Sequence, residues 1–318
     1  MINTTYTIGF SSNFPAAAST IGGTILADVR LTAGTDNKVE WFKMTGGRIS
    51  QSNTDATVNG GFNGTARIIT SGVAGTPRTD STGGAVTVAT GVSSNIGHYN
   101  DLNEGTITIR HTPFAGTMTE SITNLALTPE SVARVGTTIL TTSTPTASPN
   151  ATTWWKRRRI TLSHTQDVTE TTISGTVSYS IRKQGSFSAI GEAVFPGDGF
   201  VSWAQANRGA RPLELTDRDP LTGQPLLVMY AFRAGAGNWQ VPVTFLPGTS
   251  QVRLQLPTNG LLAPVKWEYW SGNSPVSWAP IAGTPQAGGI TPLGASGTLT
   301  IAIPAGRRGF IRASVPAP

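Results

Sequence analysis

Few residues in this sequence are spaced for acid–base or metal chemistry. The chain has no cysteine, which excludes disulfides and thiolate metal ligands. The three histidines, His98, His111 and His164, do not occur in the H-x-x-x-H or H-E-x-x-H spacing that places two zinc ligands on one helix face. The nucleophile motif G-x-S-x-G, the Walker phosphate loop and the dinucleotide-binding glycine pattern are also absent. We therefore expect neither a metal nor another cofactor.

Acidic residues that could act in pairs are found in the second half of the chain. Asp217 and Asp219 flank Arg218, while Asp198 and Glu214 lie upstream of them. A glycosidase needs two carboxylates a few ångströms apart across a sugar ring, and the sequence leaves open that Asp198 and Glu214 meet in this way. The simpler interpretation is that Asp217 and Asp219 pair with Arg218 or a neighbour, or bind Ca²⁺ weakly in a loop. We expect a protein without enzymatic activity.

The residues best suited to binding form one run after a Thr/Ser/Pro-rich stretch. The run consists of Trp154, Trp155, Lys156, Arg157, Arg158 and Arg159. Successive cations of a strand face opposite sides, and burying a cation without a partner charge costs several kcal/mol. We predict that the run docks on an acidic surface of a partner protein; the alternative is a solvated basic edge that discourages aggregation. Nucleic acid is not an expected partner, because its binding channels interleave basic and aromatic residues over a longer span.

Several other tryptophans lie beside Gly- or Pro-rich turns, where side chains are often exposed. They are Trp203, Trp239, Trp270 and Trp278. Exposed tryptophans stack on sugar rings or fill pockets in partner proteins. We therefore assign Trp270 and Trp278 as candidate contacts with a glycan or a partner protein.

The elements that position these residues are predicted to be strands. Charged residues are only 13% of the chain, while Gly (37) and Pro (21) are abundant, a composition that favours strands and tight turns over amphipathic helices. In VKWEYW, alternation places Trp267 on one face and Glu268 and Trp270 on the other. The most apolar segment, PLLVMYAF, is predicted to be a central strand. The sequence thus predicts an all-β protein.

A low-complexity stretch divides the chain. The sequence TTSTPTASPNATT, residues 141–153, has no large apolar side chain and is typical of an exposed linker. We predict two antiparallel β-sandwich domains of the jelly-roll or Ig-like kind, residues 1–140 and 154–318, joined by this linker. A long surface loop is the alternative for residues 141–153.

The C-terminal strands carry a family resemblance. The pattern is W-E-Y-W-x-G, a further Trp, and a later G-T-strand-I-P, formed by Trp267, Glu268, Tyr269, Trp270, Gly272, Trp278, Gly297, Thr298, Ile303 and Pro304. It resembles the β-sandwich modules of baseplate, fibre and decoration proteins of tailed bacteriophages. The resemblance implies a non-enzymatic structural component of the virion that contacts other virion proteins as a symmetric homo-oligomer. The alternative is a carbohydrate- or receptor-binding protein of the virion, or a secreted carbohydrate-binding module.

Charge is distributed unevenly between the halves. Residues 1–150 hold 8 Lys and Arg against 9 Asp and Glu, whereas residues 151–318 hold 15 against 8, a net charge of +7. This favours partners with acidic surfaces. The sequence shows neither a secretory signal nor an apolar run long enough to cross a membrane, so we expect no membrane partner and a protein made in the host cytoplasm and carried in the virion.

Overall fold

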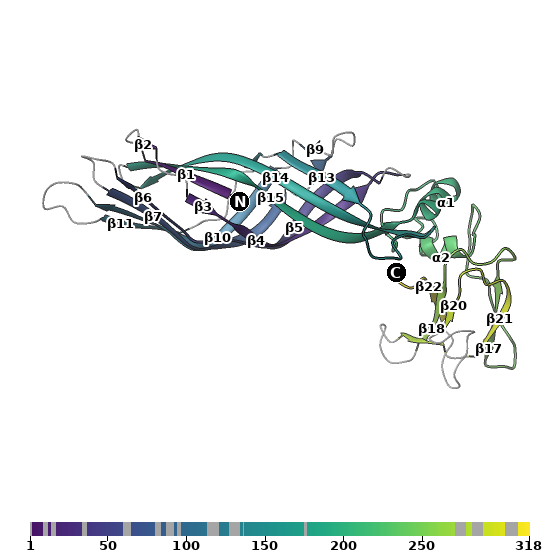
Figure 1. Cartoon of the computed structure of the whole chain (residues 1–318). Coiled ribbons are helices and arrows are strands. Elements are labelled where there is room, and N and C mark those ends of the chain that lie inside the picture. Colours follow the sequence, from purple (N-terminus) through teal and green to yellow (C-terminus); the bar gives the residue numbers. More distant parts are fainter. Residues whose placement is uncertain are drawn as a thin grey trace. The chain divides into compact units, whose positions relative to one another are not determined.

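The computed structural model of the 318-residue chain consists of two compact units (Figure 1). Unit 1 comprises residues 1–32, 36–143 and 159–191, and unit 2 comprises residues 33–35, 144–158 and 192–318. The structure describes residues 2–8, 12–13, 17–33, 37–59, 65–79, 84–86, 92–93, 97–112, 121–126, 134–135, 137–174, 177–270, 278–281, 289–302 and 311–318.

Unit 1 contains two antiparallel sheets, which Figure 1 shows as separate layers. The strand order of the first is β2-β1-β15-β14-β13-β9, with β3 beside β1. Its strands are β1 (Ile2–Ile8), β2 (Ser12–Asn13), β3 (Ala17–Ser19), β9 (Val92–Ser93), β13 (Thr137–Ser143), β14 (Trp155–Ser174) and β15 (Val177–Pro196). The order of the second is β11-β10-β7-β5-β4, with β12, β6 and β8 beside β10, β7 and β5. Its strands are β4 (Ile21–Leu31), β5 (Val39–Gln51), β6 (Thr54–Asn59), β7 (Thr65–Thr79), β8 (Gly84–Ala85), β10 (Gly97–Thr112), β11 (Ser121–Ala126) and β12 (Arg134–Val135).

Alternating burial accounts for both sheets of unit 1. In β5, Phe42 and Met44 are fully buried, while the charged Lys43 between them is only half-buried. Leu140 and Leu162, which are register partners in β13 and β14, are buried in the other sheet. Strands of this kind bury one face and leave the other to polar side chains.

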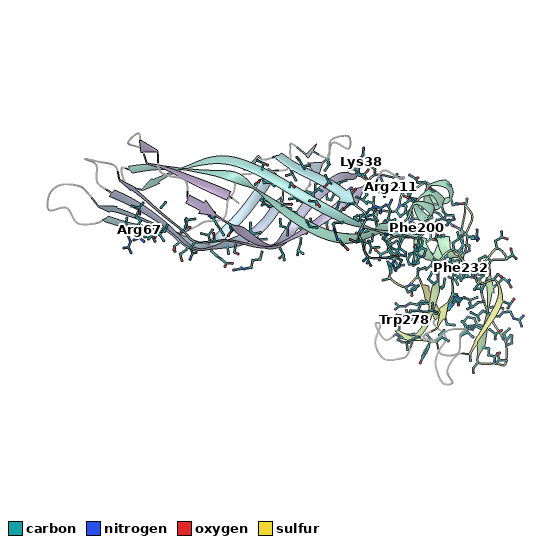
Figure 2. The ribbon with its side chains drawn as sticks, viewed as in Figure 1. Lys38, Arg67, Phe200, Arg211, Phe232 and Trp278 are labelled. Carbon is teal, nitrogen blue, oxygen red and sulfur yellow. The ribbon has the colours of Figure 1, made fainter. Side chains whose placement is uncertain are left out.

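Unit 2 combines two short sheets with two helices around one core. The sheets have the orders β16-β17-β21 and β19-β18-β20, with β22 beside β18. Their strands are β16 (Val243–Phe245), β17 (Gln251–Leu256), β18 (Val265–Trp270), β19 (Trp278–Pro280), β20 (Ile290–Thr291), β21 (Gly297–Ala302) and β22 (Ile311–Ser314). The core includes Phe200, Phe232 and Trp267, and Figure 2 labels the first two of these side chains.

Helices α1 (Asp198–Arg208) and α2 (Leu226–Ala231) lie in segments for which no helix was predicted. Asp198 in the first turn and Arg208 in the last turn of α1 complement the helix dipole, and Gly209 ends the helix in the left-handed conformation. All six residues of α2 are buried, so its predicted assignment as a central strand is wrong. An apolar run carries no periodicity that separates a buried strand from a buried helix.

The all-β class predicted from the sequence is confirmed for the described residues, but the units differ from the predicted domains in their bounds. Strand β13 extends to Ser143, inside the stretch expected to be a linker, and residues 159–191 belong to unit 1. The reason is pairing: β14 lies beside β13, and β15 lies beside β1, so this hairpin completes the first sheet of unit 1. The pairing of β15 with β1 joins segments far apart in the sequence and leaves no compositional signal.

Candidate binding face of unit 2

The aromatic end of the run Trp154–Arg159 is buried, contrary to what docking requires. Trp154 and Trp155 are 6% and 5% exposed and belong to the core of unit 2. The start of α1 lies against them, because the Gly197 N–H donates a hydrogen bond to the Trp154 carbonyl at 2.9 Å. Lys156 is 5% exposed, and its Nζ donates to Asp198 Oδ1 at 2.7 Å. These three side chains are therefore structural.

The arginines of the run remain half-buried and partly accessible. Arg158 Nη1 donates to Thr144 Oγ1 at 3.1 Å, and the Arg157 guanidinium lies 5.9 Å from the Trp155 ring centroid. Arg159 is half-buried as well. Of this run, only Arg157, Arg158 and Arg159 are accessible enough to contact a partner protein.

The acidic pair around Arg218 is built into a loop rather than into a catalytic centre. Asp217 Oδ2 accepts backbone hydrogen bonds from Leu213 and Glu214 at 2.6 and 3.1 Å. Arg218 donates to the Gly223 carbonyl at 2.8 Å instead of bonding either aspartate. In the described part of the chain, no group of three or more His, Asp or Glu side chains is placed to hold a metal ion.

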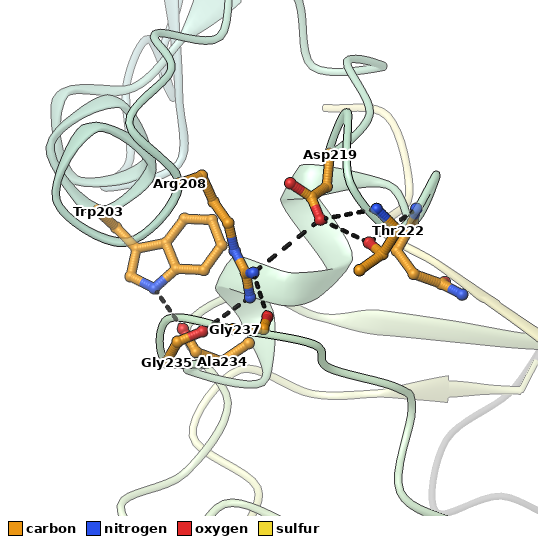
Figure 3. Close-up of polar contacts among 8 residues, drawn as sticks. Trp203, Arg208, Asp219, Thr222, Ala234, Gly235 and Gly237 are labelled. Atoms are coloured by element: carbon orange, nitrogen blue, oxygen red, sulfur yellow. Dashed lines mark hydrogen bonds and ion pairs between the residues drawn. The ribbon is translucent and has the colours of Figure 1, made fainter.

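Asp219 faces an arginine from helix α1 (Figure 3). Its Oδ2 lies 4.0 Å from Arg208 Nη1, and both side chains are 1% exposed. Arg208 also donates to the carbonyls of Gly237 and Gly235 at 2.6 and 2.8 Å, and its guanidinium lies 6.0 Å from the ring centroid of Trp203. Thr222 Oγ1 donates to the same Asp219 oxygen at 2.6 Å. The carboxylate thus holds its own loop against α1, which is a structural role.

Trp270 and Trp278 are brought together by strand pairing. They are direct register partners between β18 and β19, and such partners project from the same face of an antiparallel pair. The inward face of β18 carries Trp267, which is fully buried and donates from Nε1 to Thr291 Oγ1 at 2.9 Å. Alternation then sends Lys266, Glu268 and Trp270 to the opposite face, as predicted. Both Trp270 and Trp278 are half-buried, so each ring keeps some accessible surface.

An arginine from the last strand completes this face. Arg312 of β22 is the register partner of Glu268, and its Nε donates to Glu268 Oε2 at 2.7 Å. The Arg312 guanidinium lies 4.4 Å from the ring centroid of Trp278, within cation–π range. Lys266 Nζ lies 3.0 Å from Glu268 Oε1. We call Lys266, Glu268, Trp270, Trp278 and Arg312 the Trp–Arg face.

The electrostatics of the face centre on one carboxylate. Burial acts to raise the pKa of Glu268, but hydrogen bonds from Arg312 and Lys266 outweigh it and hold that pKa below its usual 4.5. Glu268 is therefore ionised at neutral pH, and two cations surround one anion. The face has a local net charge of +1.

Sequence reasoning identified the two tryptophans but not Arg312. The only signal available was the alternation in RGFIRASV, which places Arg312 on one face of a strand without showing which strand lies beside it. The contact with Glu268 spans 44 residues, and sheet order determines it.

Comparisons with protein-family models, curated proteins and solved structures found no match to this chain. Neither helix in the described part of the chain has the length and apolar character needed to cross a membrane.

Proposed function

We propose that the protein is a non-enzymatic structural component of a tailed-phage virion that works through protein contacts, with unit 2 as its contact unit. The observation that carries the proposal is the division of charge between the units. Unit 2 holds 12 Lys and Arg against 6 Asp and Glu, while unit 1 holds 11 of each, so the whole net charge of +6 belongs to unit 2. A basic surface speeds encounter with acidic partners and selects them.

Two further features support this proposal. The described residues that carry the resemblance to phage β-sandwich modules lie in unit 2, while Gly272, Ile303 and Pro304 lie outside the described residues. The two antiparallel sheets of unit 1 fit a sandwich of the jelly-roll or Ig-like kind. We further propose that several copies assemble with rotational symmetry, as a ring-shaped particle component would.

Mass spectrometry of purified particles and of their subassemblies tests the proposal. The protein should copurify with one subassembly, in more than one copy per particle. Its absence from every particle fraction would refute the virion role.

A charge-reversal variant tests the contact unit. Because Arg157 and Arg158 are two of the three partly accessible residues of their run, changing both to Glu should weaken incorporation into the particle, and the loss should diminish at high salt. Arg253→Glu, at an exposed position of β17, is the matched control. Normal incorporation of the double variant at all salt concentrations would exclude this run as a docking surface.

A second candidate function is the binding of a carbohydrate receptor. The pairing of Trp270 with Trp278 favours it, because indole side chains on the same face of neighbouring strands provide the stacking surface that sugar rings use. Loss of glycan-array binding on Trp278→Ala would support it, and an unaltered array profile would exclude it.

A further inference from the structure

We propose that the Trp–Arg face is selective for acidic sugars, with a sugar carboxylate held by Arg312 and the sugar ring placed on the neighbouring indoles. This inference rests on the second candidate function. It adds the chemical class of the ligand and the residue that selects it.

The terminal donors of Arg312, which no described residue engages, favour an anionic ligand. Its Nε is occupied by Glu268 at 2.7 Å, and its guanidinium lies on Trp278 at 4.4 Å. Among the described residues, no hydrogen bond or ion pair engages its two terminal amino groups, and the side chain is 47% exposed. A guanidinium fixed at Nε presents those two amino groups as a fork that fits a carboxylate with two parallel hydrogen bonds.

Glu268 positions the fork without competing for the ligand's hydroxyls. Its side chain is 8% exposed, and its two oxygens already accept from Arg312 and Lys266. Holding Arg312 in place before binding lowers the entropy that ligand binding costs. Because the pair of cations exceeds the single anion by one charge, an anionic ligand is favoured over a neutral one.

The size of the face favours a sugar over an acidic protein segment. Strands β18, β19 and β22 have six, three and four residues, and one Trp pair supplies the aromatic surface. A stable protein interface buries about 800 Å² on each partner and has a broad apolar core. A single indole pair bordered by charges instead matches one or two sugar rings.

Calorimetry with matched saccharides and the full chain tests the inference. The probes are trigalacturonic acid against its neutral methyl ester, and sialyllactose against lactose. At least one acidic probe should bind about tenfold more tightly than its neutral counterpart, because hydrogen bonds to a charged group carry that difference. Arg312→Ala should abolish the preference, and Arg312→Lys should keep only part of it, since Lys retains the charge without the fork.

Three controls distinguish the outcomes. Arg253→Ala removes an equal charge from an exposed site on another sheet of unit 2 and should leave binding unchanged. Thermal melting of each variant identifies a folding defect, and Arg312→Lys preserves the test if Arg312→Ala unfolds. Hexaglutamate serves as the acidic peptide probe.

Several results would overturn the inference: no binding of either acidic sugar, equal binding of acidic and neutral forms, or an acid preference that survives in Arg312→Ala. Binding of hexaglutamate but not of the sugars would assign the face to protein docking. None of these results bears on whether the protein is found in particles, so the virion proposal is tested separately.

Discussion

Changing Glu268 to Gln should destabilise unit 2 in a pH-dependent way. The Glu268 carboxylate accepts from Arg312 Nε at 2.7 Å and lies 3.0 Å from Lys266 Nζ. Gln keeps one acceptor oxygen but turns an amide N–H₂ towards the second cation, so one charge-assisted hydrogen bond is lost. Such bonds contribute about 1.5–3 kcal/mol. Since Arg312 and Lys266 are 47% and 34% exposed, solvent screening reduces the expected loss to about 1–2 kcal/mol.

The sign of the pH dependence follows from the direction of the pKa shift. Burial raises the pKa of Glu268, but the hydrogen bonds from Arg312 and Lys266 lower it by more than burial raises it. The folded pKa therefore lies below the unfolded value of 4.5. The stabilisation is therefore complete above pH 4.5 and is lost as the pH falls through the folded pKa. The variant and the unaltered protein should differ at neutral pH, and the difference should shrink as the pH falls below 4.5 through the folded pKa.

Tryptophan fluorescence during urea unfolding provides the assay. Seven of the eight tryptophans lie in unit 2, so the signal reports mainly on that unit. Glu214→Gln, at an exposed carboxylate of the same unit, is the matched control and should show little change. A destabilisation by Glu268→Gln that stays the same from neutral pH down through acid pH would refute the ion-pair explanation, as would no destabilisation at neutral pH.

Two further predictions concern backbone space and buried charge. Gly105→Ala in β10 should destabilise unit 1 by about 1–3 kcal/mol in circular-dichroism melts, because φ is +98° and a Cβ would lie 2.6 Å from the Ser71 carbonyl oxygen. Gly22→Ala, with no atom within 4 Å, should be tolerated, and equal effects would contradict the argument. Asp198→Ala should cost about 3 kcal/mol in urea unfolding, because it removes the carboxylate that accepts from the buried Lys156 ammonium. Lys156→Met should cost less than about 1 kcal/mol, since Asp198 is 44% exposed and stays hydrated. A larger loss of stability in Lys156→Met than in Asp198→Ala would exclude this explanation.

Strand alternation was the feature that the sequence predicted best. In β17 the burial pattern alternates strictly along QVRLQL, and in β18 Trp267 enters the core while Glu268 and Trp270 face away. Both strands have one face on the core and one face towards polar surroundings, so each side chain's polarity reports its direction. The same reasoning failed for α2, because every residue of that segment is buried and polarity gives no direction.

Long-range pairing decided what the sequence could not predict. Trp154 and Trp155 follow an exposed-looking stretch, yet the Phe200 N–H donates to the Thr153 carbonyl at 3.0 Å and brings α1 over them. Lys156 is buried because Asp198 supplies its partner charge from 42 residues away. The run of cations correctly indicated that partner charges are needed, but the partner of its first cation, Lys156, is Asp198 of the same chain.

Two arginines of unit 2 each contact an indole and a carboxylate, but one is suited to a structural role and the other to binding. Arg208 and Arg312 each lie over an indole and near a carboxylate, at 6.0 Å from Trp203 and 4.4 Å from Trp278. The Arg208 side chain is 1% exposed, and its terminal amino groups are taken by two backbone carbonyls, so it can only hold the fold together. Arg312 bonds its carboxylate through Nε, its side chain is 47% exposed, and no described residue hydrogen-bonds its terminal amino groups. Recognition of an anion requires a cation that is fixed at one end and keeps donors for the ligand at the other. Among the described residues Arg312 meets this condition and Arg208 does not, which is why the binding proposal rests on Arg312.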